Sequence, residues 1–220
     1  MLVYQHCVWS ILTPLPYPAC TLRGRMLALS PMTSLASNVS RNLVCHPRTP
    51  CRSIDAIEVQ VESATSGILA LSFVLQGDVT TLRIPEERPC RRVDELWRHT
   101  CFEAFLMTGS GPDYREYNFS PSGEWAAYAF RDYRQANHQP AGVAADEPVP
   151  VIRVQRGAHR LALEAEVSLE PPPLTRSIRL GLSAVLETVD GELSYWALRH
   201  PPGKPDFHHA DAFALQLDVS

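Results

Sequence analysis

The stretch IDAIEVQVES, residues 54–63, alternates apolar and polar side chains along most of its length. Ile57, Val59 and Val61 fall on one face of an extended chain, and polar side chains fall on the other. Successive side chains of a strand point to opposite faces, so this period of two predicts a strand with one buried face. Alternation of this kind is typical of antiparallel sheets that cover a core on one side.

The same period recurs along the chain in HRLALEAEV (159–167) and DAFALQLDV (211–219). GILALSFVLQG (67–77) is apolar on both faces, as expected of a central strand. Short turns separate the runs, and the Asp190-Gly191 pair between AVLET and ELSYWAL is a strong hairpin signal. No long helical pattern is present. About nine or ten strands at this spacing predict an all-β fold, an antiparallel β-sandwich of the immunoglobulin or jelly-roll kind.

The composition of the chain limits its possible domain organisation and its possible binding partners. The chain has 220 residues, 20% of them charged, and a formal net charge of -4. We find no run of basic residues, which disfavours nucleic acid, and no apolar run of about 18 residues that would span a membrane. Residues 1–42 lack any period and are interpreted as an irregular extension, which a wrong choice of start codon would explain. Residues 43–220 are predicted to form one domain, and without a convincing signal peptide we expect a cytoplasmic protein with Cys45 and Cys51 as free thiols.

The strand CFEAFLM, residues 101–107, contains one ionisable carboxylate among apolar side chains on both faces. A buried carboxylate without partners is costly, so Glu103 is expected to be paired, protonated or facing a polar cavity. An arginine partner inside the fold is the structural alternative.

The following hairpin has the turn SPSG at residues 120–123. If Phe119 pairs with Glu124, one sheet face gathers an aromatic plane, an amide and a carboxylate beside two small alanines. The members of that face are Tyr114, Glu116, Asn118 and Trp125. Such a face suits a polyhydroxylated ligand, because a sugar ring stacks on an aromatic plane while polar groups bind its hydroxyls. The alternative is a solvent-exposed face with a surface tryptophan, and a slip of one residue would exchange the two faces.

A third informative stretch is SYWALRHPPGKPDFHHADAF, residues 194–213. After Trp196 it is rich in proline, glycine and histidine, which predicts a structured loop over one end of the sandwich. Its histidines match no standard metal-ligand spacing, so no metal site is predicted. The alternative role of this loop is that Phe207 closes the core.

Three segments also resemble the bacterial DOMON-like proteins, a branch of the DOMON superfamily related to the family-9 carbohydrate-binding modules. They are LWRHTCFEAFL (96–106), YREYNFSPSGEWAAYAF (114–130) and YWALRHPPGKPDFHH (195–209). The resemblance extends over residues 43–219 and implies an antiparallel β-sandwich that binds sugars or haem against one sheet. It implies a sugar site made by Glu103, Asn118, Trp125 and Trp196. For haem it implies a Met/His ligand pair, for which Met107 with His200 or His208 are the candidates.

Together these patterns predict a non-catalytic domain that binds a small polar ligand, with a carbohydrate as the expected partner and no cofactor. The predicted ligand-binding residues are Trp97, Glu103, Tyr114, Glu116, Asn118, Trp125, Trp196 and His200. Three alternatives remain: a haem-binding redox module, a hydrolase in which Glu103 and Glu116 act as acid and base, and a domain that docks another protein.

Overall fold

The computed structural model describes residues 37–63, 67–136, 148–169 and 177–218, which contain twelve strands and three short 3-10 helices. All pairings between the strands are antiparallel. The strands are β1 (Ser37–Cys45), β2 (Ile54–Ser63), β3 (Ile68–Gly77), β4 (Cys101–Met107), β5 (Tyr114–Phe119), β6 (Trp125–Asp132), β7 (Gln135–Ala136), β8 (Val151–Arg156), β9 (Arg160–Ser168), β10 (Ser177–Glu187), β11 (Leu193–Ala197) and β12 (Leu215–Asp218). The helices are η1 (Val79–Thr81), η2 (Leu96–Arg98) and η3 (Ala210–Ala212).

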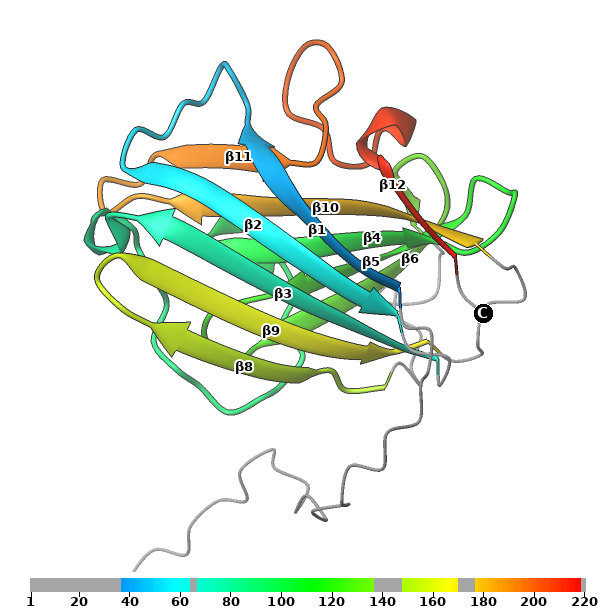
Figure 1. The fold of residues 1–220 in the computed structure, drawn as a ribbon, viewed down its shortest axis with the longest axis horizontal. Coiled ribbons are helices and arrows are strands. Elements are labelled where there is room, and N and C mark those ends of the chain that lie inside the picture. The colour runs from blue at the N-terminus through cyan, green and yellow to red at the C-terminus, as the bar shows by residue number, and fades with distance from the viewer. Residues whose placement is uncertain (1–36, 64–66, 137–147, 170–176, 219–220) are drawn as a thin grey trace, which may run out of the picture.

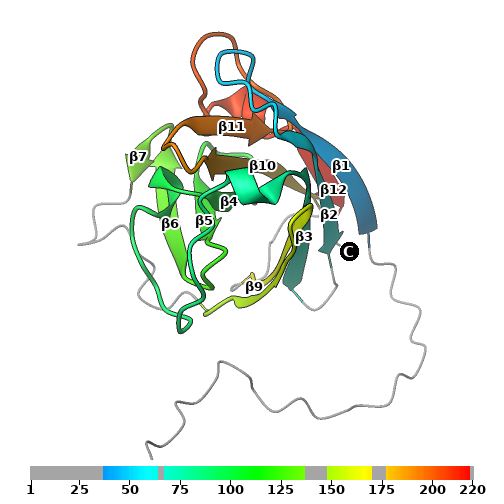
Figure 2. The same ribbon diagram turned by 90° about the vertical axis from the view of Figure 1, so that its left-hand side faces the viewer.

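The strands form two layers (Figures 1 and 2). One layer has the order β8-β9-β3-β2-β1, and the other has the order β7-β6-β5-β4-β10, with β11 and β12 end to end along the free edge of β10. The layers are joined where the end of β1 pairs with β11, at Val44–Ala197 and Cys45–Trp196. This arrangement confirms the predicted antiparallel β-sandwich.

The core lies between the layers and follows the period of two. Ile57, Val59 and Val61 are fully buried on β2. The rings of Phe73 on β3 and Phe102 on β4 meet across the gap, with their centroids 5.1 Å apart. The alternation in residues 54–63 therefore predicts the correct buried face.

Strand β1 begins at Ser37, so residues 37–42 belong to the sandwich although they lie inside the predicted extension. Val39 pairs with Val61 and Leu43 with Ile57, which places both β1 side chains against β2. The prediction that residues 1–36 are an irregular extension lies outside the described residues. Among the helices that the structure does describe, none has the length and apolar character of a membrane span.

The predicted pairing of the β5–β6 hairpin is wrong by one residue. Phe119 pairs with Trp125 instead of Glu124. The turn is present as expected, with a hydrogen bond from the Gly123 amide to the Ser120 carbonyl oxygen, but Glu124 extends the loop. Its carboxylate is held inside the loop, because it accepts a hydrogen bond from Ser122 Oγ at 2.9 Å. The faces of β6 are thereby exchanged relative to the prediction.

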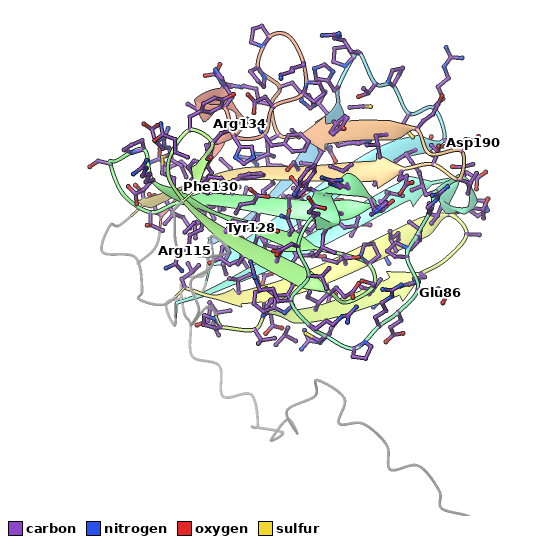
Figure 3. All side chains as sticks on the ribbon, turned by 180° about the vertical axis from the view of Figure 1, so that it is seen from behind. Glu86, Arg115, Tyr128, Phe130, Arg134 and Asp190 are labelled. Atoms are coloured by element: carbon purple, nitrogen blue, oxygen red, sulfur yellow. The ribbon has the colours of Figure 1, made fainter. Side chains whose placement is uncertain are left out.

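The outer face of the β4–β6 layer is covered by two loops. From the segment between β3 and β4, Leu96 packs on Cys101 and Ala126. From the β11–β12 loop, residues 198–214, Phe207 and Phe213 pack on a second apolar cluster. Strand β4 is consequently buried on both faces, as its sequence predicts. Figure 3 looks at the molecule from behind, with Tyr128 and Phe130 along β6 and Arg134 beyond them toward the β11–β12 loop.

Candidate functional site

A cavity of about 490 Å³ lies on the outer face, between the two covering loops. Its floor comes from β4, β5 and β6 and from neighbouring β10 and β11, while η2 and the β11–β12 loop supply its sides. The lining residues are Trp97, Arg98, Glu103, Phe105, Glu116, Tyr128, Phe130, Arg134, Val185, Leu193, Tyr195, Pro205, Phe207 and His208. The site is therefore assembled from one sheet face and two loops far apart in sequence.

Aromatic rings make up much of the cavity wall. Trp97 is 44% exposed and lies beside Arg98, whose guanidinium carbon is 5.3 Å from the indole centroid. Phe105 lies deeper, with its ring centroid 6.4 Å from that of Phe207. The wall thus offers flat apolar surfaces both at a solvent-exposed position and at a buried one.

Glu103 is the buried carboxyl of the cavity floor, with only 2% of its surface exposed. Its Oε2 accepts a hydrogen bond from Ser183 Oγ at 3.2 Å, whereas its Oε1 has no hydrogen-bond partner among the described residues. Burial, and then the charge of Glu116, raise the pKa of Glu103 well above its ordinary value, against a smaller opposing effect of Ser183. Glu103 therefore holds unused hydrogen-bonding capacity inside the cavity.

Glu116 is the second buried carboxyl, and it lies diagonally across the β4–β5 ladder from Glu103. Phe105 is directly opposite Glu116, and Asn118 directly opposite Glu103, so the two glutamates are next neighbours on one face. Asn118 Nδ2 donates to Glu116 Oε1 at 2.7 Å. Burial raises the pKa of Glu116 to about 7, although Asn118 and Arg134 act in the opposite direction.

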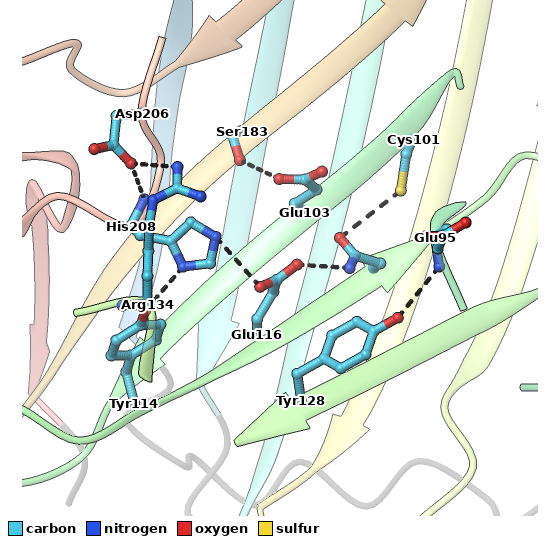
Figure 4. Close-up of polar contacts among 11 residues, drawn as sticks. Glu95, Cys101, Glu103, Tyr114, Glu116, Tyr128, Arg134, Ser183, Asp206 and His208 are labelled. Carbon is cyan, nitrogen blue, oxygen red and sulfur yellow. Dashed lines mark hydrogen bonds and ion pairs between the residues drawn. The ribbon is translucent and has the colours of Figure 1, made fainter. Parts of the chain in front are cut away.

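His208 approaches Glu116 from the β11–β12 loop (Figure 4). The Arg134 amide donates to the Tyr114 hydroxyl at 3.2 Å, and that hydroxyl lies 2.8 Å from His208 Nδ1. The other ring nitrogen of His208, Nε2, lies 3.7 Å from Glu116 Oε2, so the imidazole bridges the Tyr114 hydroxyl and the Glu116 carboxyl. Burial and Arg134 lower the pKa of His208 to about 4, so its imidazole is uncharged at neutral pH and the contact is not a salt bridge.

Asp206 ties this loop to the end of β6. Its carboxylate accepts hydrogen bonds from the Tyr133 hydroxyl at 2.6 Å, from the Arg134 guanidinium at 2.8 Å and from the His208 amide at 3.2 Å. Burial acts to raise the pKa of Asp206, but the bonds from Tyr133 and Arg134 outweigh it and the pKa is lowered. We call these contacts the Asp206 clamp, which holds Phe207 and His208 over the cavity.

Asp206→Asn is expected to loosen this clamp, because a neutral amide is a weaker acceptor for Arg134 than a carboxylate. Since Arg134 and Tyr133 are about half exposed, the free energy of unfolding should fall by only about 1 kcal/mol. Amides of residues 206–209 should exchange hydrogen about fivefold faster. Hydrogen exchange followed by mass spectrometry measures this, with the exposed Asp211→Asn as the matched control. Equal protection of the loop in both variants would contradict the clamp.

The structure brings some of the predicted ligand-binding residues together. Trp97, Glu103 and Glu116 line the cavity directly. Asn118 and Tyr114 lie behind them, where they hold Glu116 and His208. These five residues therefore lie at one cavity, with Asn118 and Tyr114 behind the wall in contact with the lining residues Glu116 and His208.

The other three predicted residues lie elsewhere. Trp125 and Trp196 are both buried in the core between the layers. Trp125 is there because of the one-residue shift in the hairpin, and Trp196 because it pairs with Ala184, whose side chain also points into the core. His200 Nε2 lies 2.8 Å from the Val44 carbonyl oxygen and does not line the cavity.

Several lining residues were missed by the sequence patterns. Tyr128 and Phe130 are assigned to the core by the incorrect register, and the corrected pairing opposite Glu116 and Tyr114 places them in the site. Tyr195 precedes Trp196 on β11, so the two side chains point to opposite faces of the sheet. The prediction places Trp196 on the outer face, whereas Tyr195 is the residue that lies there. His208 and Arg134 depend on loop contacts for which the sequence carries no local signal.

The residues suggested for haem do not fit a Met/His-ligated iron. Met107 does not line the cavity that His208 lines, and its sulfur contacts the Arg179 guanidinium. His208 is held between Tyr114 and Glu116, and His200 is bonded to a β1 carbonyl. Among the described residues, no group of three or more His, Cys, Asp or Glu side chains could hold a metal ion.

Comparison with known proteins gives a likeness of fold. No family model matches the chain, and no curated protein matches it. A crystal structure from Bacteroides uniformis, provisionally described as a carbohydrate-binding protein, matches with a TM-score of 0.56 at 12% identity, covering 83% of this chain and 86% of that one. A family-9 carbohydrate-binding module from Caldicellulosiruptor kristjanssonii, in complex with cellotriose, matches with a TM-score of 0.39 at 11% identity, covering 69% and 72%. The first match shows that the chain shares a known β-sandwich fold.

Proposed function

We propose that this chain is a non-catalytic binding domain for a small polyhydroxylated ligand, with a saccharide as the expected class, held in the cavity on the outer face of the β4–β6 layer. The observation that carries the proposal is the pairing of aromatic walls with two inward carboxyls. A sugar presents an apolar ring face that stacks on an aromatic plane, and hydroxyls that bind carboxyl oxygens. Trp97 offers such a plane, and Glu103 Oε1 is a buried carboxyl oxygen without a hydrogen-bond partner among the described residues.

The size of the cavity supports a small ligand. Its volume of about 490 Å³ falls within the range of about 300 to 1,000 Å³ that is common for small-molecule sites. A mostly apolar lining with a few convergent polar groups is also the usual composition of such sites. The Bacteroides uniformis protein that shares the fold has a provisional description as carbohydrate-binding, which agrees with the proposal.

The pair of carboxyls also raises the alternative of a hydrolase. Glycoside hydrolysis generally needs one carboxyl to act as an acid and the other to be ionised as a nucleophile or base, on opposite sides of the scissile bond. Here Glu103 and Glu116 are neighbours on one sheet face, and the pKa of both is raised. Glu103 is not a ready anion and Glu116 is only partly ionised at neutral pH, which favours binding over turnover.

Calorimetric titration with a panel of mono- and disaccharides tests the proposal. At least one saccharide is expected to bind, without release of reducing sugar. Trp97→Ala and Glu103→Gln should each weaken this binding about tenfold or more, because the first removes a stacking plane and the second replaces a carboxyl oxygen by an amide NH2 group.

Glu164→Gln is the matched control, because Glu164 is an exposed strand glutamate on the other layer. Its affinity should equal that of the wild type. A panel without any binding, or equal affinities of all three variants, would overturn the proposal.

A further inference from the structure

We propose that the ligand carries a protonated amine, which the cavity holds between the carboxyls of Glu103 and Glu116. This inference rests on the proposed function and specifies its ligand as an amino sugar or a similar hydroxylated amine.

Glu103 has a buried oxygen that lacks a hydrogen-bond partner among the described residues. Glu103 is 2% exposed and lines the cavity, yet its Oε1 receives no hydrogen bond from any described residue. Buried polar atoms in folded proteins nearly always have a partner. A group that enters the cavity and donates to Oε1 would complete the site. An ammonium offers three donors, whereas a hydroxyl offers one.

The adjacency of Glu116 makes a charged donor more favourable than a neutral one. Two carboxyls that share a buried site cannot easily both ionise, and their repulsion is one reason why the pKa of Glu103 is raised. A cation between the two carboxyls favours the ionised form of each. Because the two side chains are diagonal neighbours across the β4–β5 ladder, one amine can reach both.

The protein's own cations near the cavity are committed to other carboxylates. The Arg134 guanidinium lies 2.8 Å from Asp206 in the clamp. The Arg98 guanidinium lies 2.8 Å from Glu95. Arg134 lowers the pKa of Glu116 only in part, since burial still raises it to about 7. The carboxyl pair therefore lacks a dedicated cation of its own among the described residues.

The aromatic walls add to the attraction for a cation. Tyr128, Phe130 and Phe207 line the same cavity as the two glutamates. The negative face of an aromatic ring attracts an ammonium group, more strongly where water is displaced. His208 does not oppose this attraction, because its imidazole is uncharged at neutral pH.

The groups that face the carboxyl pair define the expected pH dependence. They are Cys101, Tyr114, Tyr128, Tyr195, His208, Arg98, Arg134 and, through the clamp, Asp206. Burial raises the pKa of the thiol and of the three tyrosines, so these groups stay neutral near pH 7. Binding of an amine should therefore ionise the carboxyls and release protons. Affinity should rise with pH through about 7, where Glu116 titrates, until the amine itself loses its proton.

Isothermal titration calorimetry with matched ligands tests the inference. Each hexose of the panel is used in three forms, with a hydroxyl, a free amine or an N-acetylated amine at the same carbon, and each titration is run in two buffers of different ionisation enthalpy. The free-amine form is expected to bind at least tenfold more tightly than the other two, with net release of protons to the buffer. Glu116→Gln should reduce both effects, whereas Glu164→Gln should leave them unchanged. Melting temperatures confirm that the variants are folded.

The outcomes separate this inference from the proposed function. Equal affinity for the three forms of a sugar would contradict the proposed amine and would leave the proposed saccharide site unaffected. A free amine that binds without proton release, or equally well to Glu116→Gln, would overturn its placement between the carboxyls. Cyclohexylamine binding as tightly as any hexosamine would support the amine but overturn the polyhydroxylated ligand. A panel in which nothing binds would overturn both.

Discussion

Trp196→Ala is expected to lower the free energy of unfolding by about 3–5 kcal/mol, the range for truncating a large aromatic side chain in a well-packed core. Trp196 is 5% exposed and lies in the core between the layers. Its backbone pairs with Ala184 of β10 on one side and with Cys45 of β1 on the other, at the place where the two layers join. A cavity at this junction would loosen contacts in both layers at once.

Denaturant unfolding followed by circular dichroism measures this loss, with Trp97→Ala as the matched control. Trp97 is 44% exposed and should lose less than about 1 kcal/mol. The two tryptophans are thus expected to have opposite roles, Trp196 in stability and Trp97 in ligand binding. Similar losses of stability in the two variants would contradict the placement of Trp196 in the core.

Glu116→Gln is expected to change stability in a way that depends on pH. In the unfolded chain Glu116 titrates near its ordinary value of 4.5, and in the folded protein near 7. Between these values the folded state holds a proton that the unfolded chain has lost, so the contribution of Glu116 to stability is complete below pH 4.5 and declines as pH rises to about 7. Glutamine does not titrate. The difference in unfolding free energy, variant minus wild type, should therefore increase by up to about 3 kcal/mol over this window.

The difference is the quantity to measure, because His208 titrates in the opposite sense. Its folded pKa of about 4 lies below its ordinary value of 6.5, so its contribution to stability is lost as pH falls through that window. His208 is present in both proteins and largely cancels in the difference. Urea unfolding at a series of pH values provides the data, with Glu164→Gln as a control that should give a flat line. A flat line for Glu116→Gln would show that its carboxyl is not held protonated in the fold.

The sequence predicts the fold well because burial acts on every second residue of a strand. The alternation of Ile57, Val59 and Val61 directly identifies the buried face of β2, and the same alternation occurs in β9 and β12. The hairpin turns are equally local, since Asp190-Gly191 needs only its own backbone conformation, with Gly191 at a φ of +84°.

The site is harder to predict, because it depends on the register and on covering loops. One extra loop residue, Glu124, reverses the two faces of β6, and its hydrogen bond with Ser122 and its ion pairs with Arg88 and Arg91 show why it stays in the loop. The isolated carboxylate in CFEAFLM does identify Glu103, because charge on a strand buried on both faces is a local anomaly. The position of His208 is set by Tyr114, which is distant in sequence, and by Asp206, whose contact depends on the conformation of the loop. Neither contact can be read from the local sequence.

The alternation of β4 and β5 has a practical consequence for engineering. Odd-numbered β4 positions from Cys101 to Met107 and even-numbered β5 positions from Tyr114 to Asn118 belong to the outer face. The intervening Phe102, Ala104, Leu106 and Tyr117 fill the core between the layers. The cavity-lining members of the first set are Glu103, Phe105 and Glu116, so a combinatorial library at these three positions is expected to reshape the cavity wall, with a cost in stability because all three are buried. A library at Phe102, Ala104 and Tyr117, in contrast, would alter the core between the layers and leave the residues that line the cavity unchanged.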